Sequence, residues 1–172
     1  GGPLEILQLW VNLPARLKMT APHYTGLQAE EIPVAKLAGG RVQLHAVSGE
    51  WWNVKGPVQP LTDVQLCWME WSAGAELELS IAAERTIFFY VLRGSLRVNG
   101  TTVTTHGLAE FGEAGDLLHI EAKEDSVLLF GHALPFREPL VAYGPFVMNT
   151  SEEIRQAYTD YQNGLFGSDE LL

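Results

Sequence analysis

The chain has 172 residues, of which 47% are hydrophobic and 19% charged, a composition that suits one globular domain with extensions. The formal net charge is −10 and the 11 lysines and arginines are scattered, which argues against a surface for DNA or RNA. No apolar run reaches the roughly 18 residues of a membrane helix and no signal-peptide pattern is present, so we expect a soluble protein without a membrane partner. The single cysteine, Cys67, cannot form an internal disulfide and favours a reducing, cytoplasmic compartment.

The first forty residues predict one strand followed by an irregular connector. Residues 6–13 have the apolar pattern of a strand, with no loop or cap of their own before them. This abrupt start leads us to expect a piece of a longer protein, so that residues 1–40 combine the end strand of a preceding domain with a connector. The connector from 14 to 40 is indicated by residues that break regular structure: Pro14, Pro22, Pro33, Gly39 and Gly40.

Residues 41–135 predict an all-β barrel or sandwich, because short apolar segments alternate with glycine turns at nearly regular spacing. Asn99-Gly100 supplies the two positive-φ residues of a type I′ hairpin turn. The expected strands are 41–47, 63–71, 75–82, 86–93, 95–98, 101–105, 116–121 and 125–131.

Residues 136–172 predict a tail with one α-helix at about 151–163. Thr150 and Glu153 have the spacing of a capping box, and Asn163-Gly164 provides a stop. An apolar stripe on one face needs a surface to pack against. It consists of Ile154, Ala157, Tyr158 and Tyr161.

Four glycines match the spacing of the two cupin motifs: Gly74, Gly94, Gly107 and Gly115. Cupins are double-stranded β-helix barrels of the jelly-roll type, so this resemblance implies an all-β cupin barrel, here with a connector before it and a C-terminal helix after it. In metal-binding cupins, three histidines and a glutamate occupy four positions within this spacing. The same positions in this chain are vacated and hold Ser80, Ala82, Ile87 and Leu118, and the motif proline is Glu113. These side chains cannot converge as imidazole and carboxylate donors on a metal, so we predict no catalytic, cofactor-binding or metal-binding residue.

Nearby titratable residues are predicted to face away from the barrel interior. Glu76 and Glu78 alternate with leucines, as on a strand with one solvated face. If Leu118 and Ile120 face inward, His119 and Glu121 must face outward by strand parity. The remaining candidates are a surface ion pair of Glu84 with Arg85, and histidines in four separate segments, His23, His45, His106 and His132.

Two stretches outside the barrel resemble the pirin family closely. They are "LQLWVNLPARLKM", which contains "QLWVNLP", and "REPLVAYGPFVMNTSEEIRQAYTDYQNGLFG", which contains "YGPFVMNT". The barrel between them is similar to the second cupin of pirins, which are bicupins. The likeness runs over nearly the whole chain and identifies it as the C-terminal half of such a protein.

This resemblance implies an iron site of three histidines and a glutamate in a missing N-terminal cupin, and no cofactor in this chain. Bacterial members are described as quercetin 2,3-dioxygenases and eukaryotic members as nuclear, redox-sensitive transcription cofactors. If the full-length protein is eukaryotic, the resemblance implies a nuclear location. The full-length protein would be either an enzyme or a transcription cofactor. This chain alone is not expected to be an enzyme.

Two roles remain open. The first is a metal-free scaffold that packs against the N-terminal cupin and other protein partners, suggested by "TIFFYVL", where Phe88, Tyr90 and Leu92 face outward and Ile87, Phe89 and Val91 inward. The alternative is a metal-independent, small-molecule-binding cupin that acts alone, because the small Ser80 and Ala82 would leave an interior cavity.

Overall fold

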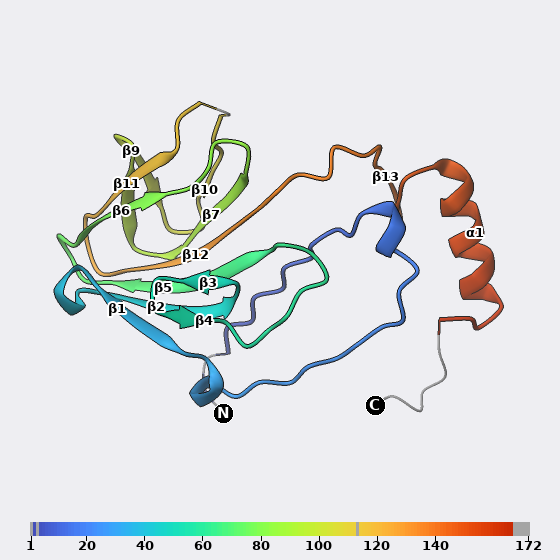
Figure 1. The fold of residues 1–172 in the computed structure, drawn as a ribbon, viewed down its shortest axis with the longest axis horizontal. Coiled ribbons are helices and arrows are strands. Elements are labelled where there is room, and N and C mark those ends of the chain that lie inside the picture. Colours follow the sequence, from blue (N-terminus) through green and yellow to red (C-terminus); the bar gives the residue numbers. More distant parts are fainter. Residues whose placement is uncertain (1, 3, 113, 167–172) are drawn as a thin grey trace. The chain divides into compact units, whose positions relative to one another are not determined.

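The computed structural model describes residues 2, 4–112 and 114–166 (Figure 1). The motif position Glu113 lies outside these residues. The chain divides into two compact units, which we describe separately: residues 23–135, and residues 1–22 together with 136–172. In the described ranges, no helix is long and apolar enough to cross a membrane.

The unit of residues 23–135 is a β-barrel of two antiparallel sheets. The larger sheet has six strands in the order β1-β2-β5-β12-β7-β10, and the smaller has four in the order β6-β11-β8-β9. The first sheet contains β1 (Val34–Leu37), β2 (Val42–Ser48), β5 (Gln65–Trp71), β7 (Thr86–Arg93), β10 (Leu108–Ala109) and β12 (Ser126–Ala133). The second contains β6 (Glu76–Ser80), β8 (Ser95–Val98), β9 (Thr101–Thr104) and β11 (Leu117–Ala122). A separate hairpin joins β3 (Glu50–Trp51) to β4 (Val54–Lys55), and 3-10 turns lie at Ala29–Glu31 and Ala38–Gly40.

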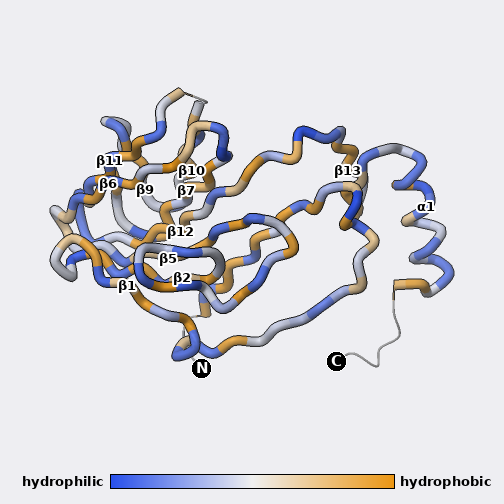
Figure 2. The backbone as a smooth tube through the Cα atoms, viewed as in Figure 1, coloured by the Kyte–Doolittle hydropathy of each residue, from blue (hydrophilic) through white to orange (hydrophobic). Residues whose placement is uncertain are grey.

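Side chains from the inner faces of both sheets fill the barrel. This is the expected consequence of the period-two alternation of apolar residues along each strand. Figure 2 shows the hydrophobic positions along the strands in orange. The largest fully buried side chains are Leu44, Met69, Phe89, Leu96, Ile120, Leu128 and Phe130.

The predicted eight strands are present within one or two residues of their expected ends, and Asn99-Gly100 forms the expected turn between β8 and β9, with φ of 45° and 86°. The sequence pattern missed the short strands β1, β3, β4 and β10. The connector prediction was wrong at its end, because β1 lies within 14–40 and pairs with β2. Pro33 directly precedes this edge strand, where its missing N–H costs no ladder hydrogen bond.

Residues 6–13 form no strand within this chain, and the end strand of a preceding domain expected here stays a prediction. A strand needs a hydrogen-bonding neighbour, and no described residue provides a ladder here. The first turn of regular structure is the 3-10 segment Ala15–Leu17.

The second unit carries helix α1 (Ser151–Gln162) on a hairpin of β13 (Val141–Tyr143) and β14 (Phe146–Met148). The predicted capping box is present: Thr150 accepts a hydrogen bond from the Glu153 N–H, and the Glu153 carboxylate accepts one from the Thr150 N–H. Of the predicted stripe, Ile154 and Ala157 are buried, and Tyr158 meets Phe146 edge to face at 4.9 Å. Tyr161 remains 65% exposed.

Gly144 occupies the turn between β13 and β14 because it has φ of 57° and because a Cβ there would lie 2.2 Å from the Tyr158 hydroxyl. The positive φ favours glycine here, and a larger residue would also displace the end of the Tyr158 side chain. The glycine of "YGPFVMNT" therefore suits this turn and leaves room for the Tyr158 hydroxyl.

Candidate functional site

The four vacated cupin positions do not converge on one point. The ladder between β6 and β11 pairs Leu79 with Leu118 and Ser80 with Leu117. Paired residues share a face of the sheet, so Ser80 lies on the face opposite Leu118. Leu79 and Leu118 are 3% and 4% exposed, whereas Ser80 and Ala82 are exposed.

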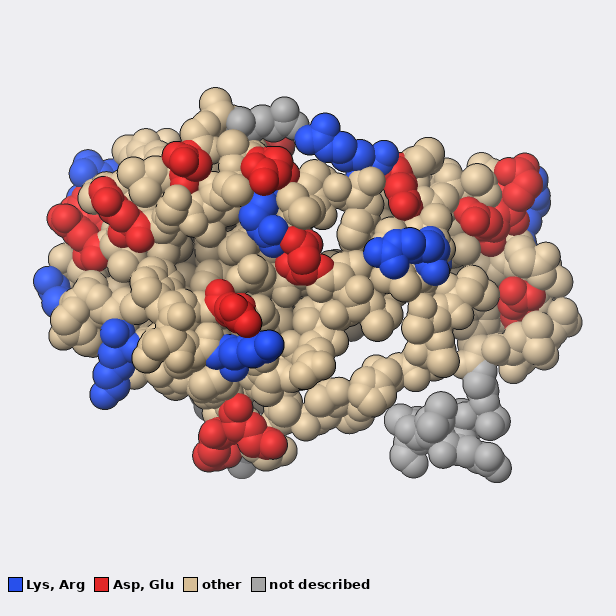
Figure 3. Space-filling view, in the orientation of Figure 1, with Lys and Arg blue, Asp and Glu red and all other residues tan. Residues whose placement is uncertain are grey.

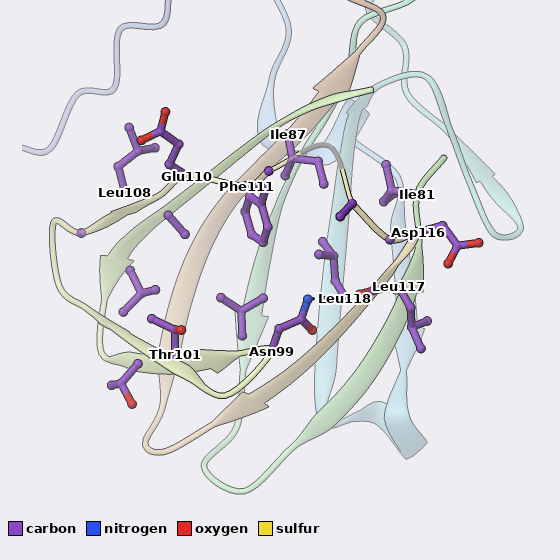
Figure 4. A pocket seen from close by; sticks show the side chains of 18 of the residues that line it. Ile81, Ile87, Asn99, Thr101, Leu108, Glu110, Phe111, Asp116, Leu117 and Leu118 are labelled. Atoms are coloured by element: carbon purple, nitrogen blue, oxygen red, sulfur yellow. Dashed lines mark hydrogen bonds between the residues drawn. The ribbon is translucent and has the colours of Figure 1, made fainter. Parts of the chain in front are cut away.

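The prediction that the small Ser80 and Ala82 leave an interior cavity is therefore wrong, because both residues are exposed and do not face the interior. Their strand neighbour Ile81 faces the core instead. A cavity of about 580 Å³ does lie at the mouth of the barrel, where Ile81, Ile87 and Leu118 meet Phe111 (Figure 4). Its described lining combines apolar side chains with threonines and the carboxylates of Glu110 and Asp116, but it contains no histidine, lysine or arginine and so no cationic anchor.

The outward parity predicted for the titratable residues of β6 and β11 is confirmed. His119 and Glu78 meet across the outer face at 3.7 Å, and both are exposed. Glu121 contacts Lys123 at 2.6 Å and Arg97 at 2.8 Å. The hydrogen bond from Lys123, with the charge of Arg97, lowers the pKa of this carboxyl.

Arg85 does not form the predicted pair with Glu84. Its guanidinium donates to the Asp63 carboxylate at 2.7 Å and to the Asp63 carbonyl at 3.1 Å. Its Nε donates to Nδ1 of His132 at 2.6 Å. Nothing in the local sequence indicates this cluster, because its members come from three segments that only the sheet pairing brings together.

His132 is kept neutral by this environment. The pKa of His132 is lowered to about 4. Burial is the largest cause, the charge of Arg85 lowers the pKa as well, and the Asp63 carboxylate raises it by a smaller amount. Since Nδ1 accepts the bond from Arg85, the ring proton of the neutral form is on Nε2. With His132 uncharged, the opposite charges of Arg85 and Asp63 balance. The cluster of Arg85, Asp63 and His132 therefore links the loop that contains Asp63 to β12 without a net charge.

Two other groups sit in apolar surroundings. His45 stacks on Trp68 at 4.4 Å, its Nε2 has no hydrogen-bond partner among the described residues, and burial lowers its pKa. Cys67 is fully buried, which raises the pKa of its thiol well above the usual value. The Glu70 carboxylate lies 4.0 Å from Nε2 of His45, and its charge opposes part of the lowering of the His45 pKa. Among the described residues, neither His45 nor Cys67 belongs to a group of three side chains that could hold a metal ion.

The residues present do not fit the iron that the cupin resemblance implies. Serine, alanine, isoleucine and leucine at the four motif positions provide no imidazole or carboxylate. Among the described residues, no group of three His, Cys, Asp or Glu side chains could hold a metal ion. On the face shown in Figure 3, basic side chains lie interspersed with acidic ones and do not gather into a patch of the kind that binds nucleic acid.

The most exposed apolar segment is residues 4–11. Leu4, Ile6 and Trp10 are 82%, 76% and 72% exposed, and Leu7 and Val11 are each about half exposed. Single exposed hydrophobic residues are ordinary, but a contiguous run that also lacks a strand partner is typical of an interaction site. By contrast, Phe88 and Tyr90, predicted to form excess outer surface, are half-buried, and Leu92 is buried.

Within its unit this segment adjoins a groove of about 430 Å³ next to the β13–β14 hairpin. Its lining includes Trp10, Val11, Leu140, Pro145, Val147 and Met148. Glu138 fixes the arrangement by accepting hydrogen bonds from the Ala15 N–H at 2.7 Å and the Asn149 side chain at 3.1 Å. The side-chain oxygen of Asn149, Oδ1, is buried and has no hydrogen-bond partner among the described residues.

Comparison with known proteins gives a consistent family match. Residues 66–167 match the family of the Pirin C-terminal cupin domain. A Pseudomonas aeruginosa protein, PA2418, provisionally named a quercetin 2,3-dioxygenase, is 36% identical over 96% of this chain and 58% of its own length. Pirin from Mus musculus is 37% identical, again over 96% of this chain and 58% of its own length.

Solved structures extend this likeness to the fold. A crystal structure of quercetin 2,3-dioxygenase from Acinetobacter baumannii has a TM-score of 0.86 and 32% identity, covering 92% of this chain and 56% of that chain. The bacterial pirin YhhW from Escherichia coli, 26% identical over 45% of this chain and 34% of its own with a TM-score of 0.42, was solved in complex with nickel(II). This chain thus spans a little over half the length of the curated relatives it matches.

Proposed function

The chain belongs to the pirin family and carries its C-terminal cupin domain, and on this basis we propose that residues 1–172 are the docking half of a two-barrel protein. In this proposal the chain packs against an N-terminal cupin barrel that holds the iron. The parent protein would then carry out quercetin 2,3-dioxygenase-like oxidation, or act as a transcription cofactor, through that other barrel.

The observation that carries the proposal is the exposed apolar segment at 4–11. Six of its eight side chains are apolar and all are exposed, so the segment can add to the edge of a neighbouring sheet and cover apolar surface there. The curated relatives are longer by about two-fifths of their length, which is enough for a second barrel to supply that edge.

Titration with the N-terminal barrel of a relative tests this function. The amino-terminal half of the Pseudomonas aeruginosa protein is produced as a separate chain and titrated into the 172-residue chain by calorimetry. We expect an equimolar complex, and we expect Trp10→Ser to weaken it by about tenfold or more, since buried tryptophans dominate interface energies. Leu61→Ser is the matched control, because Leu61 is also exposed, at 55%, but lies in the other unit.

The same samples test where the chemistry lies. Iron and the loss of flavonol absorbance are measured for each half and for the complex, and we expect both to follow the N-terminal barrel. A docking role would be refuted by the absence of a complex, or by Trp10→Ser and Leu61→Ser having equal effects. Stoichiometric iron with ring-opening activity in the 172-residue chain alone would refute the assignment of the chemistry.

A further inference from the structure

A second cavity lies between β6 and the β3–β4 hairpin, apart from the barrel mouth. Its volume is about 550 Å³, which is within the range of small-molecule sites. Strand β6 is an edge of the four-stranded sheet, so this side of the cavity has no neighbouring strand in that sheet. The side chains that matter for recognition are Glu50, Trp51, Trp52, Glu78, Ser80 and His132.

The hairpin that forms one wall is firmly anchored. Trp51 is 4% exposed, its indole N–H donates to the Ser48 carbonyl at 2.9 Å, and its ring meets His132 edge to face at 5.4 Å. The Gly56 N–H closes the base of the hairpin by donating to the Gly49 carbonyl at 2.9 Å. The buried Trp51 side chain therefore anchors the hairpin and fixes the position of the next residue, Trp52.

That neighbour, Trp52, is held in an unfavourable conformation at the pocket edge. It begins the two-residue loop between β3 and β4 with φ of 49°, a position where glycine is preferred and a bulky residue costs about 1–2 kcal/mol. Its side chain is nonetheless 55% exposed, so packing does not repay this cost. Strain of this kind, in a residue that lines a cavity, indicates a binding role.

The charges around the cavity favour a cation. Glu50 and Glu78 line it and are both well exposed, at 77% and 64%. The only basic side chain in its described lining is Arg85, whose charge is balanced by Asp63 at 2.7 Å. His132 also lines the cavity but is uncharged, because burial and the Arg85 charge hold its pKa at about 4. Lys55 lies 3.6 Å from Glu50 but does not line the cavity. An exposed indole with two carboxylates is the combination that attracts alkylammonium groups.

We propose that this cavity binds a small organic cation of the quaternary ammonium type, with Trp52 providing the aromatic face and Glu50 and Glu78 the opposite charge. Ser80, the residue at a vacated metal position, lines the same cavity and supplies a hydroxyl to the ligand.

The test compares choline with its neutral isostere 3,3-dimethylbutan-1-ol, which replaces the charged nitrogen by carbon. Both are titrated into the 172-residue chain by calorimetry and by two-dimensional NMR of the backbone amides. Choline is expected to bind at one site about tenfold more tightly than the neutral compound, with amide shifts at 50–55 and 78–82.

Variants then assign the contributions. Trp52→Gly and Glu78→Gln are each expected to weaken choline binding about fivefold or more. Trp52→Gly should keep or raise the thermal midpoint, because glycine suits the turn, so lost binding cannot be attributed to unfolding. Glu76→Gln is the matched control: it lies on the same strand and the same face, but does not line the cavity.

Three outcomes would overturn the proposal. They are no saturable binding of choline, equal binding of the neutral isostere, and equal effects of Glu76→Gln and Glu78→Gln, which would indicate only diffuse surface charge.

Discussion

The neutral His132 makes the stability of the barrel depend on pH. Its pKa is lowered from 6.5 to about 4 in the folded chain, so the folded state resists a proton that the unfolded state accepts. The stabilisation is fully present above about pH 6.5 and is lost as the pH falls toward 4. Each pKa unit corresponds to about 1.4 kcal/mol, an upper limit of about 3 kcal/mol for the whole shift. His132 is only half-buried, so solvent screening reduces this to about 1–2 kcal/mol.

The measurement is urea unfolding of the wild type and of His132→Asn between about pH 7.5 and pH 5. The asparagine carbonyl can still accept the Arg85 Nε–H but does not titrate in this range. We expect the wild type to lose about 1 kcal/mol more than the variant over this range. His45 also has a lowered pKa and contributes with the same sign, but it is common to both proteins and cancels in the difference. Parallel pH profiles for the two proteins would refute the assignment to His132.

Three further predictions concern the core, the helix cap and the cysteine. Phe89→Ala should destabilise the barrel by about 3–5 kcal/mol in urea unfolding because Phe89 is fully buried, whereas Tyr24→Ala, at a residue 90% exposed, should change it by less than about 0.5 kcal/mol. Thr150→Ala should cost about 1 kcal/mol and reduce helical circular dichroism, since it removes the acceptor for the Glu153 N–H; an unchanged spectrum and midpoint would contradict the capping role. Cys67 should react with a thiol reagent only after unfolding, because it is buried with a raised pKa, and rapid labelling of the native chain would show the strand pair β5–β12 to be open.

Local patterns were sufficient for the elements whose signals lie within one segment. The Asn99-Gly100 turn, the Thr150 cap and the alternation of β11 all follow from a few neighbouring residues, and all are present. Residues 6–13 form no strand within this chain, because an apolar pattern does not supply the partner that must complete the ladder, and the end strand expected there stays a prediction. The apolar side chains of segment 4–11 are exposed.

The candidate sites were harder to predict because they combine distant segments. Arg85 reaches His132 and Asp63, which are 47 and 22 residues away, so its sequence neighbour Glu84 was a misleading partner. The cavity beside Trp52 likewise joins the β3–β4 hairpin to β6 and β12. One local signal was available in the pair Trp51-Trp52 at a hairpin turn, where a bulky residue occupies a glycine position.

The position of Ser80 explains why glycine spacing could find the fold without locating the site. The matched glycines lie in turns, so their spacing does not fix the register of the strands between them. A shift of one residue in a strand's register moves every side chain of that strand to the other face of the sheet. The ladder with β11 places Leu79 on the core face, so an interior ligand position at this height is filled by leucine and not by a small residue. Burying such a side chain contributes about 2 kcal/mol, so the barrel gains packing energy where a metal cupin has polar ligands. The leucines thus stabilise the barrel without ligands at these positions, and the roles that we propose use surfaces instead: segment 4–11, in the other unit, toward another barrel, and the Trp52 cavity toward a ligand.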